Sequence, residues 1–169
     1  RTGLVLSGPN PGGKTVALKC LGLAALLCRA GIPIPSAEGS RVDLFDPVLA
    51  DIGDTQAVEE GLSTFSGHLK ALMEILVQAR PGALVLLDEL AVGTDPSQGA
   101  ALAQAVLEAL VDRGARVATT THYGPLKALA AVDDRFDSAA VQYAQGRPTY
   151  RLVTGVAGRS HAVGVAERL

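Results

Sequence analysis

An eight-residue segment between two apolar runs combines residue types that together can bind phosphate. The segment GPNPGGKT, residues 8–15, matches the pattern G-x-x-x-x-G-K-[ST]. Glycines let successive backbone N–H groups turn toward one anion, and a following helix adds the positive end of its dipole. Lys14 can reach the β- and γ-phosphates of ATP, and the hydroxyl of Thr15 can ligate Mg²⁺. The residues predicted to contact the nucleotide are Gly8, Pro9, Asn10, Pro11, Gly12, Gly13, Lys14 and Thr15.

A second segment, ALVLLDE at residues 83–89, places two carboxylates at the end of an apolar run. Ligands of open α/β sheets bind at the carboxyl ends of the strands, where both acids would lie. We predict that Asp88 holds Mg²⁺, directly or through water, and that Glu89 polarises the water that attacks the γ-phosphate. Two acids at a strand end can also simply cap a helix. The glycine-rich segment upstream favours the catalytic interpretation.

Strand and helix patterns alternate around these two segments. Short apolar runs predict buried parallel strands, and apolar residues spaced by three and four predict helices. Strands are expected at residues 3–7, 83–87 and 115–121, with one or two more within 43–54. Helices are expected at residues 14–30, 65–79, 124–131 and 160–169, and another follows Asp95. Residues 138–144 and 149–153 flank a turn and predict an antiparallel hairpin, which completes an α/β fold.

Two of the predicted helices have sequence features that fix their start or their buried face. Asp95 can cap the helix that follows it, because Pro96 suits the first helical position and Gln98 completes a capping-box pattern. The apolar stripe of this helix is predicted at Leu102, Ala105, Val106, Ala109 and Leu110. The stripe of the helix at 65–79 is predicted at Leu69, Leu72, Met73 and Leu76.

The composition argues against several functional classes. The 169 residues are 48% hydrophobic and carry a net charge of −2, which predicts a sizeable core and no broad basic surface. Aromatic residues make up 4% and Trp is absent, so any DNA or RNA would be held by other segments. No apolar run reaches membrane-spanning length and no signal peptide is present, so we expect a cytoplasmic protein with no membrane partner.

The two cysteines do not suggest a redox or metal site. Cys20 and Cys28 lie in one predicted helix, about 12 Å apart along its axis, which is too far for a disulfide. We expect both to be small buried residues in a reducing compartment.

Several segments together resemble the MutS family of DNA mismatch-repair ATPases, which belong to the wider ABC class. The glycine-rich loop, LLDE, GTDP and TTHY carry this resemblance. STFSGH (63–68), GTDPSQGAALA (93–103), THYGPLKALA (121–130) and YRLVTGVAGRSHAVGVA (150–166) are similar to one branch, the bacterial paralogue that carries a C-terminal Smr nuclease domain. Two positions depart from the family pattern: Pro11 stands where Thr or Met is usual, and Ala91 where glycine is usual. Proline has no backbone N–H, so the loop must bind phosphate without that donor.

The resemblance implies a fold, a domain and further site residues. The fold would be a P-loop NTPase of α/β class, an ABC-type ATPase head, with residues 1–169 as one domain of a longer chain. Ser63 matches the signature serine that contacts the γ-phosphate of the opposite subunit, although its local pattern alone predicts only a helix start. Asp95 matches a loop that crosses the dimer interface, and His122 matches the switch histidine that senses the γ-phosphate. Asp54 and Gln56 lie where a water or Mg²⁺ contact is common, whereas His68 and His161 are interpreted as ordinary.

The function implied is MgATP hydrolysis by a homodimer that powers clamp-like changes on DNA. In this branch the role would be restraint of recombination or an action on ribosomes, through segments outside these residues. One alternative is the ABC head of a chromosome-maintenance or recombination-repair protein, against which STFS argues. Another is a nucleotide-sensing module with little turnover, which Pro11 keeps open. A small-molecule P-loop kinase is less favoured, because no acceptor-binding lid is evident.

Overall fold

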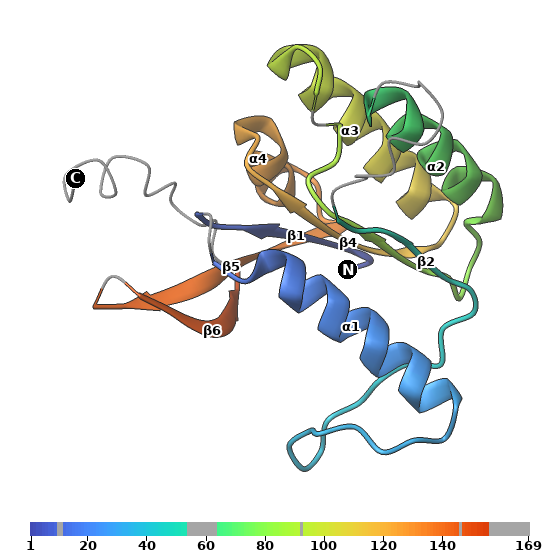
Figure 1. The fold of residues 1–169 in the computed structure, drawn as a ribbon, viewed down its shortest axis with the longest axis vertical. Helices are drawn as coiled ribbons and strands as arrows, with labels where there is room; N and C mark the ends of the chain where they lie inside the picture. The colour runs from blue at the N-terminus through green and yellow to red at the C-terminus, as the bar shows by residue number, and fades with distance from the viewer. Residues whose placement is uncertain (10–11, 54–63, 92, 146, 156–169) are drawn as a thin grey trace.

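The computed structural model describes residues 1–9, 12–53, 64–91, 93–145 and 147–155. These residues form a six-stranded sheet with strand order β2-β3-β4-β1-β5-β6 (Figure 1). The strands are β1 (Gly3–Ser7), β2 (Val48–Asp51), β3 (Leu84–Leu87), β4 (Arg116–Thr121), β5 (Phe136–Ala144) and β6 (Arg147–Thr154). The helices are α1 (Lys14–Arg29), α2 (Thr64–Gln78), α3 (Pro96–Asp112) and α4 (Gly124–Val132). All neighbouring strands pair in parallel except β5 and β6, which form an antiparallel hairpin.

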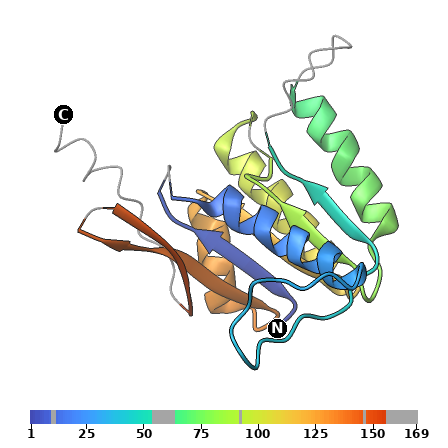
Figure 2. The same ribbon diagram turned by 60° about the horizontal axis from the view of Figure 1, so that its bottom comes forward.

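Helices cover both faces of the sheet, which explains why strand β3 is apolar throughout. Helix α1 lies on one face, and α2, α3 and α4 lie on the other (Figures 1 and 2). Within β3, Leu84 and Leu86 pack in the cluster that contains Leu18 of α1, while Val85 and Leu87 pack in the larger cluster under the other helices. Alternate residues of a strand point to opposite faces, so a strand covered on both sides is typically apolar on both of them.

The sequence correctly predicted an α/β fold with a mostly parallel sheet and a late hairpin. The predicted strands and helices within the described residues all occur, with bounds that differ by a few residues. The region 43–54 contributes one strand, β2, and the helix predicted at 160–169 lies outside the described residues. No helix in the described part of the chain is long and apolar enough to cross a membrane.

The buried faces of two helices differ from the predicted stripes. In α2 the side chains of Leu72 and Ile75 are buried, whereas Leu69 and Met73 are 37% and 62% exposed. In α3, Ala105 is exposed and the buried positions include Ala103, Val106, Leu107 and Leu110. Both helices are apolar around much of their circumference, so the apolar spacing identified a helix without fixing which face meets the sheet.

The prediction that both cysteines are buried is wrong. Cys20 is exposed, on the side of α1 opposite its buried residues, and Cys28 is partly exposed at the flank of that buried face. They form no disulfide, as expected from their spacing.

Strand register brings the segments that follow three central strands to one edge of the sheet. Ser7 of β1 pairs with Thr121 of β4, and Leu87 of β3 pairs with Thr119 of β4. The residues just beyond these positions therefore meet at the carboxyl edge: the glycine-rich loop after β1, the acids after β3 and the histidine after β4. Ligand sites of parallel α/β sheets lie at this edge.

Candidate functional site

The glycine-rich loop after β1 approaches its own backbone so closely that side chains would not fit. A Cβ atom at Gly12 would lie 2.6 Å from the carbonyl oxygen of Pro9. Gly13 has φ +86°, a left-handed conformation that glycine adopts without strain, and it caps the start of α1. Pro9 and Gly12 thus lie close together directly before the first turn of α1, as an anion-binding loop requires. Asn10 and Pro11 lie outside the described residues.

Lys14 is held inside this loop although its position is unfavourable for a cation. It is the first residue of α1, where the helix dipole repels positive charge, and its exposed fraction is 4%. The Nζ atom donates a hydrogen bond to the carbonyl oxygen of Gly8 at 3.0 Å. Burial lowers the pKa of Lys14, and the charges of Glu89 and Asp88 oppose that shift. A partly desolvated cation facing two carboxylates at a helix start is suited to binding phosphate together with a metal ion.

The two acids after β3 are fixed by a buried threonine of the next strand. Thr120 of β4 is completely buried, and its hydroxyl donates to Oδ1 of Asp88 at 2.5 Å. The same hydroxyl oxygen accepts the backbone N–H of Glu89 at 2.9 Å. The N–H of Asp88 donates to the carbonyl oxygen of Asp51 at the end of β2. Glu89 has φ +48°, so the chain turns sharply at this residue.

The residues after β4 connect to the segment that follows the acids. His122 is exposed directly beyond β4, and its ring lies 4.4 Å from that of Tyr123, measured between centroids. The hydroxyl of Tyr123 donates to the carbonyl oxygen of Ala91 at 3.1 Å. Burial, followed by the charges of Glu89 and Asp95, raises the pKa of Tyr123. The structure therefore brings His122 to the same edge as the acids.

Asp95 caps α3 as the sequence predicted. Its Oδ1 atom accepts the backbone N–H groups of Ser97 and Gln98 at 3.0 and 3.1 Å, and the hydroxyl of Ser97 at 2.5 Å. The hydroxyl bond from Ser97 is the main reason that the pKa of Asp95 is lowered. The contact across a dimer interface stays a prediction. Ser63, Asp54 and Gln56 lie outside the described residues, but α2 begins directly after Ser63, at Thr64.

His68, which the sequence indicated to be an ordinary residue, makes a side-chain contact close to the site. Its Nδ1 atom lies 3.0 Å from Oδ2 of Asp51, with both side chains largely buried. This pair ties the first turns of α2 to the end of β2, and so to the carboxyl edge of the sheet. This contact could not be predicted from the sequence, because the two residues are separated by 17 positions and belong to no common motif.

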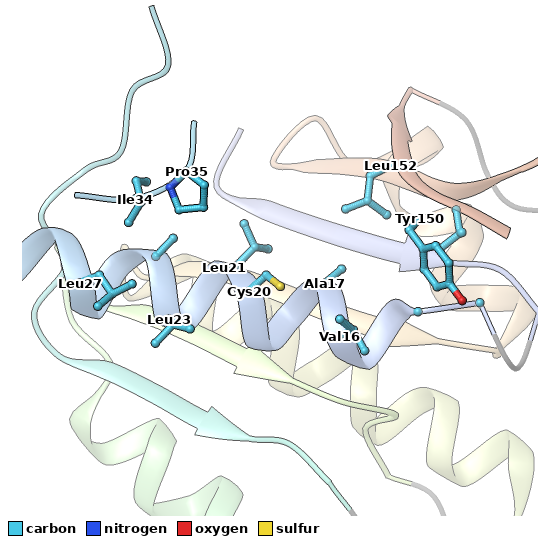
Figure 3. A pocket seen from close by; sticks show the side chains of 14 residues that line it. Val16, Ala17, Cys20, Leu21, Leu23, Leu27, Ile34, Pro35, Tyr150 and Leu152 are labelled. Carbon is cyan, nitrogen blue, oxygen red and sulfur yellow. The ribbon is translucent and has the colours of Figure 1, made fainter. Parts of the chain in front are cut away.

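An apolar pocket of about 620 Å³ lies beside the glycine-rich loop (Figure 3). It is formed by the outer side of α1, the hairpin strand β6 and residues Ile34 and Pro35. Tyr150 stands at the end near the loop, where a Cβ atom at Gly13 would lie 3.1 Å from its ring. The ring is 76% exposed, so one of its sides is open to a ligand. Tyr150 could not be predicted as a site residue from the sequence, because only the folded hairpin brings it to the loop.

The oxygen ligands at this site are too few to hold a metal ion by themselves, but they suit Mg²⁺ that is also bound to phosphate. Thr15, the second residue of α1, and Asp88 supply one hydroxyl and one carboxylate near the buried Lys14. Among the described residues there is no group of three or more His, Cys, Asp or Glu that could hold a metal ion. Magnesium is commonly bound by one or two protein oxygens, with phosphate and water completing its shell. These residues therefore fit that ion in the presence of a phosphate ligand.

Comparison with known proteins identifies the family. The family model described as MutS domain V matches residues 4–169. The chain belongs to the MutS family. A protein of Pelotomaculum thermopropionicum named endonuclease MutS2 is 53% identical over 98% of this chain. Proteins of the same name from Thermomicrobium roseum and Caldicellulosiruptor bescii are 51% and 49% identical over 98% of it. The chain spans 21% of the length of each of these relatives. The branch predicted from the sequence is thus confirmed.

Proposed function

We propose that this chain is an ABC-type P-loop ATPase domain that binds and hydrolyses MgATP. The observation that carries the proposal is Lys14, buried within a glycine-rich loop at a helix start and acted on by the charges of Glu89 and Asp88. A cation buried at the positive end of a helix is unfavourable for the helix itself and suits a site that binds an anion. The arrangement makes physical sense as a site that receives the phosphates of a nucleotide.

Each residue then has a distinct task. Lys14 and the loop amides would neutralise the β- and γ-phosphate oxygens, while Thr15 and Asp88 would hold Mg²⁺. Bound Mg²⁺ supplies charge neutralisation on the phosphates. Glu89 would orient the attacking water and accept hydrogen bonds from it. His122 would contact the γ-phosphate from the end of β4.

The apolar pocket offers a place for the base of the nucleotide. It continues from Gly13 along α1, and Tyr150 provides an open aromatic face beside the loop. An aromatic base stacked on tyrosine gains roughly 1–3 kcal/mol. We assign the base to this pocket, with the phosphates at Gly12 and Gly13.

The direct test is calorimetric titration of the protein with ATP and Mg²⁺. Lys14→Ala should abolish binding, and Lys19→Ala, an exposed lysine on the same helix, should leave it unchanged. Tyr150→Ala should weaken ATP binding by about 5- to 150-fold, the equivalent of the stacking energy, without changing the affinity for tripolyphosphate. Unchanged ATP affinity in the Lys14→Ala protein, with an unaltered circular dichroism spectrum, would refute the proposed function.

We further propose that two copies complete each other's sites and that the domain serves a longer protein. Ser63 would contact the γ-phosphate of the opposite subunit, and Asp95 would lie in the segment facing it. The relatives named endonuclease MutS2 support a role on DNA through segments outside these residues, where any nuclease activity would also lie. An action on ribosomes is the other role that the resemblance implies, and it would use such segments too. A mixture of Lys14→Ala and Ser63→Ala proteins should recover ATPase activity that neither has alone. No recovery would count against a shared site.

A further inference from the structure

Thr120 is hydrogen-bonded to both members of the acid pair, Asp88 and Glu89. Its hydroxyl proton is donated to Oδ1 of Asp88, and its oxygen accepts the N–H of Glu89. The side chain has no exposed surface. One hydroxyl thus donates to one residue and accepts from the next, and both of these residues directly follow strand β3.

The pleat of the sheet explains why only this threonine of the TTT run reaches the acids. Ala118 of β4 packs in the cluster under α1, and Thr120, two residues later, faces the same side. Leu86 and Ala118 are register partners, so Asp88 and Thr120 are at the same level on the face that α1 covers. Thr119 donates instead to the carbonyl oxygen of Thr120, and Thr121 accepts the N–H of Tyr123.

The bond to Glu89 supports a strained turn. Glu89 has φ +48°, a left-handed conformation that residues with a side chain adopt only with strain. Such conformations persist where the surroundings fix them. In this turn the N–H of Glu89 points back to Thr120, which directs the chain away from the strand at the residue that follows Asp88.

From these contacts we propose that Thr120 is a positioning residue for the acid pair. Its hydroxyl donates to Oδ1 of Asp88, so that Oδ2 is the oxygen that faces Mg²⁺. The same hydroxyl holds the backbone of Glu89 in the turn that directs the Glu89 carboxylate toward the γ-phosphate. The inference rests on the proposed ATPase function and adds a residue that touches neither nucleotide nor metal.

The test compares Thr120→Val with Thr120→Ser. Valine keeps the branched shape and removes the hydroxyl, whereas serine keeps the hydroxyl and removes the methyl. Thr119→Val is the matched control, because Thr119 is also buried and its hydroxyl donates to the carbonyl oxygen of Thr120. Thr120→Ala, compared with Thr120→Ser, isolates the hydroxyl even where the valine protein does not fold.

Two measurements are informative. The first is hydrogen exchange of the Glu89 amide in the protein without nucleotide: we expect exchange at least tenfold faster in the valine or alanine protein and near normal in the serine and Thr119→Val proteins. The second is the gain in ATP affinity on adding Mg²⁺, by calorimetry with and without EDTA. This gain should fall about tenfold in the Thr120→Val and Thr120→Ala proteins, while their affinity for ATP in EDTA stays unchanged.

The outcomes separate the two proposals. Wild-type protein that binds no ATP would overturn the proposed function, yet the exchange measurement would still test the Thr120 contact. Wild-type protein that binds MgATP, with normal Glu89 exchange and a normal Mg²⁺ gain in Thr120→Val and Thr120→Ala, would overturn the positioning role alone.

Discussion

Replacing Ala91 by glycine should leave the stability of the domain almost unchanged, although glycine is the usual residue of the family pattern here. Ala91 has φ +61° and its side chain is 6% exposed. A left-handed conformation costs alanine about 1–2 kcal/mol, which glycine would recover. Glycine would also lose a buried methyl worth about 0.8 kcal/mol and would add about 0.4–1 kcal/mol of unfolded-state freedom.

The relief of backbone strain in Ala91→Gly is about as large as the lost methyl burial and the added unfolded-state freedom together, so the three effects nearly cancel. We expect the free energy of unfolding of Ala91→Gly to lie within about 1 kcal/mol of wild type. This balance explains how alanine is tolerated at a position that favours glycine. The bond from Tyr123 to the Ala91 carbonyl uses only backbone on the Ala91 side, so it survives the change.

Valine at the same position provides the contrast. A β-branched residue in the left-handed region is strongly disfavoured, and the site is crowded, since a Cβ atom at Gly99 would lie 2.9 Å from the Ala91 carbonyl oxygen. We expect Ala91→Val to destabilise the protein by about 2–4 kcal/mol, from overpacking and backbone strain together. Ala105→Val, at an exposed position of α3, should cost below about 1 kcal/mol.

Urea unfolding followed by circular dichroism measures all three variants. The reasoning fails if Ala91→Val is as stable as Ala105→Val, because the left-handed turn would then not be required. It also fails if Ala91→Gly gains or loses more than about 2 kcal/mol, because one of the opposing effects would then be absent.

Two further predictions concern charged residues of the site. Glu89→Gln should retain MgATP binding and lose turnover by about 10²-fold or more, because it removes the group that assists the attacking water; turnover rates with saturating ATP measure this, and normal turnover would exclude the role. Asp95→Asn should alter the acid response of stability. The pKa of Asp95 is lowered in the folded protein, so its contribution is present above the ordinary value of 3.8 and is lost as the pH falls through the lower folded value. The difference in urea midpoint between wild type and Asp95→Asn should therefore shrink at acid pH, and a constant difference down to pH values well below 3.8 would contradict this assignment.

The parts of the fold and site that depend on local chemistry could be predicted from the sequence. The glycine-rich loop needs its glycines and lysine in consecutive positions, and an apolar run ending in two acids defines both a strand and its carboxyl end. The cap of α3 is likewise local, because Asp95 bonds the amides of Ser97 and Gln98 within its own turn. In each case the residues that interact are neighbours in the chain.

Contacts between distant segments could not be predicted in this way. The His68–Asp51 pair joins a helix to an edge strand, and the approach of Tyr150 to Gly13 depends on how the hairpin folds back over α1. The exposed sides of α2 and α3 were misassigned for a related reason. Their apolar residues extend beyond one stripe, and only packing against the sheet decides which of them are buried.

Thr120 shows why a buried polar residue in a strand is easily overlooked. Threonine is favoured in strands for its branched shape, so a TTT run is typical of ordinary β-structure. Yet Thr120 has no exposed surface, and a buried hydroxyl must find partners within the protein. Register places Asp88 at its level on the same face, and the turn at Glu89 supplies the second partner. The Thr120 hydroxyl therefore explains both the threonine at the end of β4 and the strained turn beyond β3, because it bonds the Asp88 carboxylate and the Glu89 amide. Valine at position 120 would remove both bonds, and the carboxylate and the amide would then need water as a partner.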